Sequence, residues 1–332
     1  MKIGDYVEYW YNTYRVMRHA PTTAEMVRNY IRVHITDSEL GKMEITEAKT
    51  LDYQIFLRDL LMHGNKANLP SLHTYGQPLS HHTVTKIRQI LVAACRWAVH
   101  EGIIKKNYAD ETEYIPVSKT TTSNVFTIEN QRKFLQYTRR HRYYVAYVLY
   151  FFTGCRRGEI LGLDWNHVHR RENYIEIAQT LIMESGVPKL KRNHAKTERS
   201  IRSIPIPTDV RMLFQEVEAR QKHERQTVAG WKNPENLVFT GKDGAPVNPS
   251  YFSRNFKNIC KRLGFPSDLH LHCTRHSWAT NMLQCGAAIS DIQALGGWTT
   301  PDMLLRIYAH TVKESQRKAI MKLYKTVHSI EQ

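Results

Sequence analysis

The chain has 332 residues, too many for one ordinary domain and enough for two that each bury a hydrophobic core. Its 47 lysine and arginine residues outnumber its 31 acidic residues and give a formal net charge of +16, while 42% of its residues are hydrophobic. That hydrophobic content is typical of a folded protein, so the composition excludes a basic disordered tail and the charge indicates a polyanionic partner.

Membrane and disulfide-stabilised classes are also excluded. No run approaches the ~18 apolar residues that span a bilayer, and the amino terminus has no signal-peptide layout, which leaves nucleic acid as the expected polyanion. The five cysteines form no CxxC pair and suggest neither a disulfide framework nor a zinc knuckle. We therefore expect a cytoplasmic protein with no membrane contact.

The first hundred residues are expected to be helical. Aromatic residues recur at helical spacing at Tyr6, Trp10 and Tyr14. The clearest helix begins near Ser80, a good N-cap residue, and stops at Gly102. One face of that helix is apolar and carries Val84, Ile87, Leu91, Ala94 and Trp97.

The opposite face of this helix is basic. It carries His81, His82, Lys86 and Arg88, which suit either a solvated surface or a surface that contacts DNA. The positive charge of the whole chain favours DNA contact. Lys86 and Arg88 are therefore candidate DNA-binding residues.

An interdomain linker is expected at residues 116–124. This segment, PVSKTTTSN, holds a proline and several hydroxyl residues and has no hydrophobic period. It divides the chain into a helical domain of residues 1–115 and a second domain of residues 125–332.

The second domain contains a buried helix near its start. Residues 143–154, YYVAYVLYFFTG, are apolar on every side and should form a core helix that ends at Gly154. Another helix should follow from about Arg157, which places Glu159 close enough to hold the guanidinium of Arg156. Such a pair is either purely structural or part of a site, because an unpaired arginine at the core boundary is costly.

From Tyr174 the pattern changes to the alternation of strands. Residues 174–182, YIEIAQTLI, and 200–207, SIRSIPIP, should form a small antiparallel sheet, with a turn at 185–186 and a charged loop between them. That loop carries Lys196. A lysine in a loop is usually only solvated, so a neighbouring site would be needed to give Lys196 a function.

Residues 270–280, HLHCTRHSWAT, combine histidine, cysteine and arginine without an acidic residue. On a helix, His272 shares a face with Arg275 and with His276. A metalloprotease-type zinc site would need a glutamate between the histidines, and none is present. The apolar residues from Trp278 onward should pack in the core, while a basic cluster that opens a helix suits an anion.

Together these segments resemble the tyrosine recombinases, also called phage-type integrases. The arginine of TGCRRGE, the lysine of AKT, the H-x-x-R of HCTR, the tryptophan after LGG and the tyrosine of YAH follow that family's order and spacing. The likeness covers about residues 125–325 through motifs, and residues 1–115 through the size and helical character of the family's core-binding domain. Two departures are that LGGW stands where LGH is common, and that one extra residue separates Trp298 from Tyr308.

The resemblance implies a fold and a reaction. The fold would be mainly α with a small antiparallel β-sheet, as a helical core-binding domain joined to an α+β catalytic domain. The protein would be a site-specific DNA recombinase that cleaves and rejoins strands through a covalent 3′-phosphotyrosyl intermediate, for integration and excision of a mobile element. The implied catalytic residues are Arg156, Lys196, His272, Arg275, Trp298 and Tyr308.

Each implied residue type suits a step of that reaction. Arg156 and Arg275 would clamp the non-bridging phosphate oxygens, since guanidinium groups bind them in bidentate fashion. Lys196 would protonate the leaving 5′ oxygen, and His272 would accept the proton of the nucleophile Tyr308.

Trp298 cannot take a proton, so its indole N–H would donate to a phosphate oxygen while its ring packs the site. Arginines take the place of the ions that a two-metal nuclease binds with carboxylates. The expectation is therefore no metal and no nucleotide cofactor.

The expected partner is double-stranded DNA that carries recombination sites. A homo-oligomer, from dimer to tetramer, would bind it, with room for an accessory DNA-bending or directionality protein, in the cytoplasm and on the nucleoid if the source is a prokaryote. Arg254 and Lys257 on a later helix join Lys86 and Arg88 as candidate DNA-binding residues. The amphipathic tail at 311–327 would form a helix that either folds back on its own domain or docks on a neighbouring protomer.

Two other functions fit the same residues. A type IB topoisomerase shares the phosphotyrosine chemistry and makes little demand on sequence, so relaxation of arbitrary plasmid DNA by a monomer would favour it. A DNA-binding regulator would have the fold without the chemistry, and would protect DNA without cleaving a strand.

Overall fold

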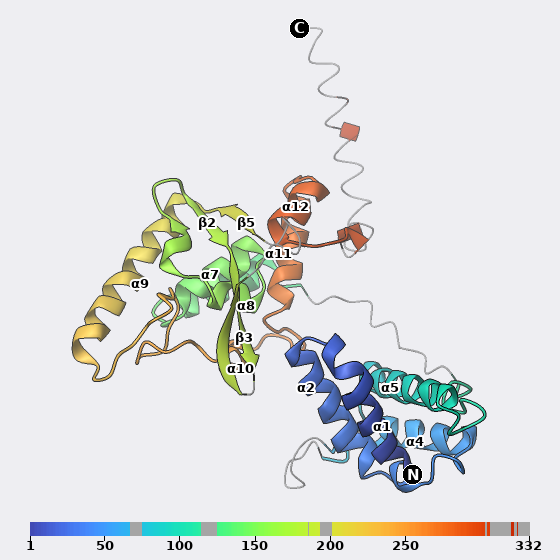
Figure 1. Cartoon of the computed structure of the whole chain (residues 1–332). Helices are drawn as coiled ribbons and strands as arrows, with labels where there is room; N and C mark the ends of the chain where they lie inside the picture. Colours follow the sequence, from blue (N-terminus) through green and yellow to red (C-terminus); the bar gives the residue numbers. More distant parts are fainter. Residues whose placement is uncertain are drawn as a thin grey trace. The chain divides into compact units, whose positions relative to one another are not determined.

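The computed structural model of the chain describes residues 1–66, 75–113, 125–184, 186–192 and 201–302, together with 304, 305, 320, 321 and 324. The chain divides into two compact units, unit 1 from Met1 to Thr121 and unit 2 from Thr122 to Gln332 (Figure 1). The expected linker, Lys196, Tyr308 and almost all of the expected tail helix lie outside the described residues.

In the described part of unit 1 the regular elements are helices. They are α1 (Ile3–Trp10), a π-helical turn (Tyr11–Arg15), a 3₁₀ turn (Val16–Arg18), α2 (Pro21–Tyr30), a π-helical segment (Ile31–Thr36), α3 (Glu39–Lys42), α4 (Thr50–His63) and α5 (His81–His100).

Helix α5 begins and ends where the sequence predicted. The Ser80 hydroxyl accepts a hydrogen bond from the backbone N–H of Thr83 at 3.2 Å, which satisfies one of the free N–H groups at the start of the helix. Beyond the other end, Gly102 adopts a φ of 74°, a left-handed conformation that costs glycine little. The face that carries Val84 and Ile87 is buried in the core of unit 1.

Unit 2 combines helices with short strands. Its helices are α6 (Ile128–Tyr137), α7 (Tyr144–Thr153), α8 (Arg157–Leu161), a 3₁₀ turn (Trp165–His167), α9 (Thr208–Thr227), α10 (Pro249–Arg262), α11 (Cys273–Gln284) and α12 (Ile289–Gly296). Its strands are β1 (Val168–His169), β2 (Tyr174–Ile177), β3 (Gln179–Glu184), β4 (Val187–Arg192) and β5 (Arg202–Pro205).

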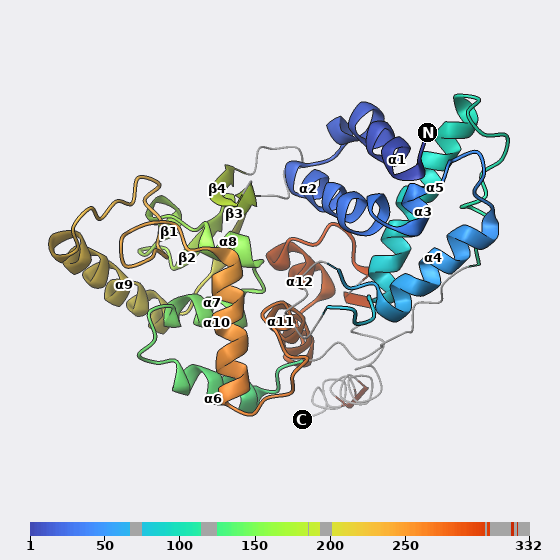
Figure 2. The same ribbon diagram turned by 90° about the horizontal axis from the view of Figure 1, so that it is seen from below.

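Most of helix α7 is buried in the core of unit 2, as its apolar sequence predicted, but Phe152 is exposed. Helices α6, α7 and α10 lie close together in unit 2 (Figure 2). The rings of Phe134 in α6 and Phe256 in α10 lie 4.6 Å apart between centroids, and both contact Tyr147 of α7. Burying each of these side chains contributes about 1.5–3 kcal/mol to the folded state. Gly154 then ends α7 with a φ of 63°. The packed core thus fixes the point at which the chain leaves α7.

The strands form two antiparallel pairings. Strand β2 pairs with β1 and β5, and in the second pairing Ile177 lies opposite Arg202. Strand β3 pairs with β4. The expectation of a charged loop at 187–192 is wrong, because these residues form β4: Lys189 is exposed, Leu190 is half-buried against the core, and backbone pairing with β3 holds the strand together.

The expected fold class is confirmed as mainly α with small antiparallel sheets. Across the described ranges, no helix combines the length and the apolar character that crossing a membrane requires.

Candidate active site

The site begins where α7 ends. Arg156 lies two residues after Gly154 and caps α8 from an extended backbone conformation. Its backbone N–H donates to Glu159 Oε2 at 2.7 Å, and its Nη1 donates to Glu159 Oε1 at 2.9 Å. The prediction that Glu159 holds this guanidinium is therefore confirmed. The Arg156 side chain is half-exposed, so it is fixed by its partner and still open to a ligand.

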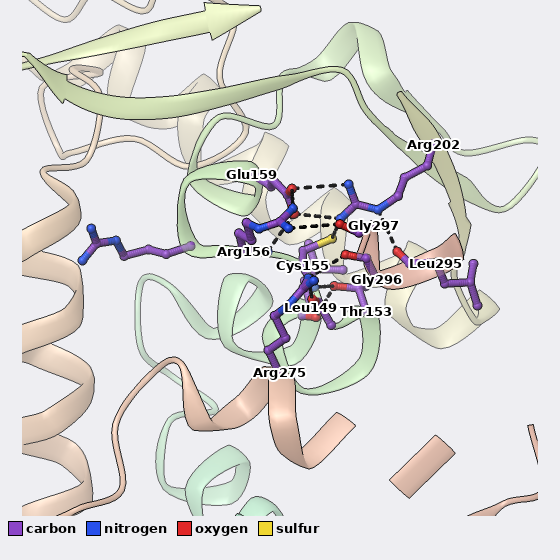
Figure 3. Close-up of polar contacts among 12 residues, drawn as sticks. Leu149, Thr153, Cys155, Arg156, Glu159, Arg202, Arg275, Leu295, Gly296 and Gly297 are labelled. Carbon is purple, nitrogen blue, oxygen red and sulfur yellow. Dashed lines mark hydrogen bonds and ion pairs between the residues drawn. The ribbon is translucent and has the colours of Figure 1, made fainter. Parts of the chain in front are cut away.

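Glu159 is the buried acid of the site. Its side chain is 4% exposed and accepts a hydrogen bond from Arg202 Nη2 at 2.7 Å as well as those from Arg156 (Figure 3). Burial alone would raise the pKa of Glu159, but the hydrogen bonds and positive charges of Arg202 and Arg156 lower it below its usual value. Glu159 therefore stays ionised at neutral pH and binds two cations.

Arg202 of β5 also belongs to the site, although no motif in the sequence indicated it. Besides its bonds to Glu159, its Nε donates to the backbone carbonyl of Leu295 at 2.7 Å. A signal was present in SIRSIPIP, because positions 202, 204 and 206 share one face of a strand. Ile204 and Ile206 are buried, and an arginine in line with them needs a buried partner.

Arg275 of α11 is almost completely buried, with 3% of its surface exposed. Its Nη1 donates to the backbone carbonyls of Gly154 and Gly296, whereas its Nη2 has no hydrogen-bond partner among the described residues. Burial, followed by the positive charge of Arg156, lowers the pKa of Arg275 to about 9, so the group is still charged at neutral pH. An anion at Nη2 would relieve the cost of leaving a buried donor unsatisfied.

Trp298 covers the guanidinium of Arg275. The central guanidinium carbon lies 3.7 Å from the indole centroid, a cation–π contact, and the indole also stacks on Trp278 with the ring planes 16° apart. Glycines make this packing possible, since a Cβ at Gly154 would lie 2.2 Å from Trp278 and a Cβ at Gly296 would lie 2.0 Å from Trp298. The LGGW segment therefore serves to place the indole.

His272 lies at the start of α11, where it precedes the first helical residue. Its ring centroid is 5.0 Å from that of His276, edge to face. Desolvation, followed by the positive charges of His276 and Arg275, lowers the pKa of His272 to about 4. Its imidazole is therefore neutral at neutral pH, with a nitrogen lone pair free to take a proton, although the lowered pKa makes it a weaker base than an ordinary histidine.

The structure brings together Arg156, Arg275 and Trp298 of the predicted catalytic residues. Arg156 Nη2 donates at 3.0 Å to the carbonyl of Gly297, the residue before Trp298. His272 lies close enough for the charges of both arginines to lower its pKa. Lys196 and Tyr308 are outside the described residues, so their places in the site stay predictions.

The candidate DNA-binding residues differ in how they are held. Lys86, Arg254 and Lys257 are exposed. Arg88 instead donates from Nε to the Thr112 hydroxyl at 2.7 Å and from Nη2 to a backbone carbonyl at 3.0 Å, and so ties α5 to the segment at 110–112. DNA contact by these residues stays a prediction.

The charges of the site favour an anionic ligand. Among the described residues, the guanidinium groups of Arg156, Arg202 and Arg275 interact with the carboxylate of Glu159, which leaves a positive balance. In the same part of the chain, no cluster of three or more histidine, cysteine, aspartate or glutamate residues could hold a metal ion. A singly charged phosphodiester suits this excess of guanidinium groups.

Comparison with known proteins gives the class. The phage integrase family matches residues 124–315. A tyrosine recombinase XerC-like protein of Caldanaerobacter subterraneus subsp. tengcongensis is 26% identical over 333 residues, which cover 96% of this chain and 81% of that protein. The ICEBs1 integrase of Bacillus subtilis is 24% identical over 253 residues, which cover 76% of this chain and 67% of that integrase.

Solved structures share the fold. The Tn1549 transposon integrase in complex with transposon right end DNA has a TM-score of 0.77 at 21% identity, and the match covers 98% of this chain and 100% of that one. A lambda integrase dimer bound to a COC′ core site has a TM-score of 0.65 at 15% identity, covering 91% of this chain and 97% of that one.

The chain belongs to the phage integrase family, whose members are tyrosine-type site-specific DNA recombinases. The family resemblance of the motifs is thereby confirmed.

Proposed function

We propose that this chain integrates and excises a mobile element by cutting and rejoining DNA strands through a 3′-phosphotyrosyl intermediate. The observation that carries the proposal is the buried Arg275 Nη2, which lacks a partner among the described residues and lies in a cluster of guanidinium groups with an excess of positive charge. A DNA backbone phosphate supplies the missing acceptor. Similarity to the ICEBs1 integrase and the Tn1549 transposon integrase supports the mobile element as the substrate.

Arg275 and Arg156 would bind the phosphate in different ways. Arg275 offers a buried donor, and Arg156 offers a half-exposed guanidinium oriented by Glu159. As the phosphorus becomes five-coordinate, its oxygens gain negative charge, and donors held in advance stabilise that charge more than they stabilise the ground state. Trp298 shields the guanidinium of Arg275 on one face and would donate its indole N–H to the phosphate.

Proton transfer falls to the remaining residues. The Tyr308 oxygen attacks phosphorus as its proton passes to the neutral His272, a 3′-phosphotyrosyl bond forms, and the bond from phosphorus to the 5′ oxygen breaks. Lys196 protonates the 5′ oxygen as it leaves. Reversal onto another strand returns the tyrosine and rejoins the DNA, so the energy of the phosphodiester is kept.

Binding is proposed to involve duplex DNA and several copies of the chain. The lambda integrase has been solved as a tetramer bound to a Holliday junction, with a TM-score of 0.65 to this chain. We propose a dimer-to-tetramer assembly on paired sites, with the 311–327 tail on a neighbouring protomer. The exposed Lys86, Arg254 and Lys257 would contact DNA, and Arg88 would hold the binding helix. The cytoplasm, on the nucleoid, is the proposed location.

The test is covalent capture on nicked DNA. A nick near the cleavage site lets the short fragment that carries the 5′ hydroxyl diffuse away, so the enzyme stays attached to the DNA. A randomised library of nicked duplexes incubated with the full chain should therefore yield a detergent-resistant complex. Sequencing the captured DNA defines the target site. The selected duplex should then be captured by the wild type and not by Tyr308→Phe. Capture by Tyr308→Phe would overturn the mechanism.

The same duplex separates the alternatives. Recombination between two copies of the selected site supports the proposal. Efficient relaxation of plasmids that lack the site would indicate a topoisomerase, and a footprint without cleavage would indicate a DNA-binding regulator.

A further inference from the structure

We infer that Arg202 is a positioning residue of this active site, which acts through Glu159 and the turn at 295–297 on Arg156 and Trp298. The inference rests on the proposed function, because it assigns Arg202 a part in the cleavage reaction. No catalytic motif in the sequence contains Arg202.

All three nitrogens of the Arg202 guanidinium donate hydrogen bonds. Its Nη2 donates to Glu159 Oε2 at 2.7 Å, its Nη1 to Glu159 Oε1 at 3.3 Å, and its Nε to the carbonyl of Leu295 at 2.7 Å (Figure 3). Only 9% of its side chain is exposed. Arg156 is half-exposed and Arg275 Nη2 lacks a partner among the described residues, whereas each nitrogen of the Arg202 guanidinium already donates to a group of the protein. Its effect on the reaction is therefore expected to pass through the groups that it holds.

Those groups carry the phosphate-binding residues. Glu159 fixes Arg156 through two hydrogen bonds, and the turn after α12 places Trp298 over Arg275. Arg202 contacts both supports, because it donates to Glu159 and to the carbonyl of Leu295 in that turn. It also lies close against Gly297, where an added Cβ would be 2.9 Å from its Nη1.

Arg156 approaches the same turn from its own side. Its Nη2 donates to the carbonyl of Gly297 at 3.0 Å. Gly297 therefore lies between the arginine that supports the site and the arginine that binds the phosphate, and loss of Arg202 would free this turn together with Glu159.

Arg202 opens β5, six residues after Lys196 in the sequence. Its ion pair with Glu159 and its hydrogen bond to Leu295 thus join three sequence-distant parts of the site, which are α8, the end of α12 and the start of β5.

The test compares Arg202→Met, Arg202→Lys and a control, Arg142→Met. Arg142 is a matched buried arginine of unit 2, since it also pairs with a buried glutamate, Glu224, and donates to backbone carbonyls, at Thr240 and Gly241, away from the site. The assay measures the single-turnover rate of covalent complex formation at saturating full-length protein, with DNA affinity and thermal stability measured beside it.

Arg202→Met should slow cleavage about 100-fold, the loss expected when reacting groups shift by about 1 Å, while its DNA affinity stays close to that of the wild type. Arg202→Lys should recover part of the rate, because an ammonium keeps the charge but cannot bridge the carboxylate and the carbonyl. Arg142→Met should lose stability and cleave at nearly the wild-type rate at temperatures where it is folded.

A substrate with an uncharged group in place of the phosphate distinguishes a positioning role from a merely structural one, because only a positioning role makes the cleavage defect depend on the phosphate charge. On a duplex with a methylphosphonate at the cleaved position, the negative non-bridging oxygen is absent and the arginines matter less, so the defect of Arg202→Met should shrink at least tenfold relative to the wild type. A defect of unchanged size on this substrate, or a rate for Arg202→Met equal to that of Arg142→Met, would overturn the inference.

The inference can still be tested if Arg202→Met fails to fold. If Arg202→Met does not fold, the rate of Arg202→Lys and its change on the methylphosphonate decide the question alone. Failure of the wild type to form any covalent complex would refute the proposed function itself, whereas a fast Arg202 variant beside an active wild type refutes only the positioning role.

Discussion

Replacing Glu159 with glutamine should destabilise unit 2 by about 3–5 kcal/mol, the usual cost of removing one partner from a buried ion pair. The smaller contribution of surface ion pairs, at most about 1 kcal/mol, does not apply here. The Glu159 side chain is only 4% exposed and that of Arg202 is only 9% exposed. Glutamine keeps the shape but offers one acceptor oxygen where the carboxylate offers two, and its amide would face an arginine donor. It also removes the negative charge that offsets Arg156, Arg202 and Arg275.

Thermal unfolding of the full chain measures this loss. At about 2–4 °C per kcal/mol for a domain of this size, the unfolding temperature of unit 2 should fall by roughly 6–20 °C. The matched control is Glu216→Gln, since Glu216 also accepts two hydrogen bonds from one arginine, Arg139, but with both side chains about half exposed. That pair should contribute at most about 1 kcal/mol. Equal losses for the two variants would refute the claim that the site is built on a buried acid.

Three further predictions use other parts of the structure. Gly154→Ala should lower the free energy of unfolding in urea by about 2–5 kcal/mol, because alanine is strained in the left-handed conformation and its Cβ would overlap a tryptophan side chain. Gly102→Ala, with a similar φ and open space around it, should cost only the strain. Similar losses for the two variants would contradict this reasoning. His272→Asn should reduce the pH dependence of stability. The pKa of His272 is about 4 in the folded state and ~6.5 in the unfolded state, so the wild type loses stability as the pH falls through that window. If the variant kept the wild-type difference in unfolding temperature between pH 7 and pH 5, the prediction would be wrong. Lys86→Ala should weaken DNA binding, measured by fluorescence anisotropy, without changing stability. Arg88→Ala should lower the unfolding temperature, because it removes the hydrogen bonds to Thr112. Equal stability of the two variants would be inconsistent with the structure.

The features that sequence predicted well are those decided by local chemistry. An all-apolar run followed by a glycine specified α7 and its end at Gly154, and a spacing of three residues sufficed to pair Arg156 with Glu159. Ser80 and Gly102 bounded α5 for the same reason. In each case the interacting groups lie within a few residues of one another.

The features that sequence left out depend on register and on contacts between distant segments. Arg202 reaches Glu159 because β5 pairs with β2 in one particular register, and the lysine-rich segment of β4 becomes a strand because β3 pairs with it along its backbone. The glycines before Trp298 give no local sign that they make room for an indole against Arg275.

The most direct measurement is mass spectrometry of the trapped covalent complex after digestion by protease and nuclease. The mechanism predicts one modified peptide, which contains Tyr308 and carries a nucleotide joined through its 3′ phosphate to the oxygen of that tyrosine. A nucleotide attached through a 5′ phosphate, or attached to any other side chain, would contradict the assignment of Tyr308 as the nucleophile opposite Arg156 and Arg275.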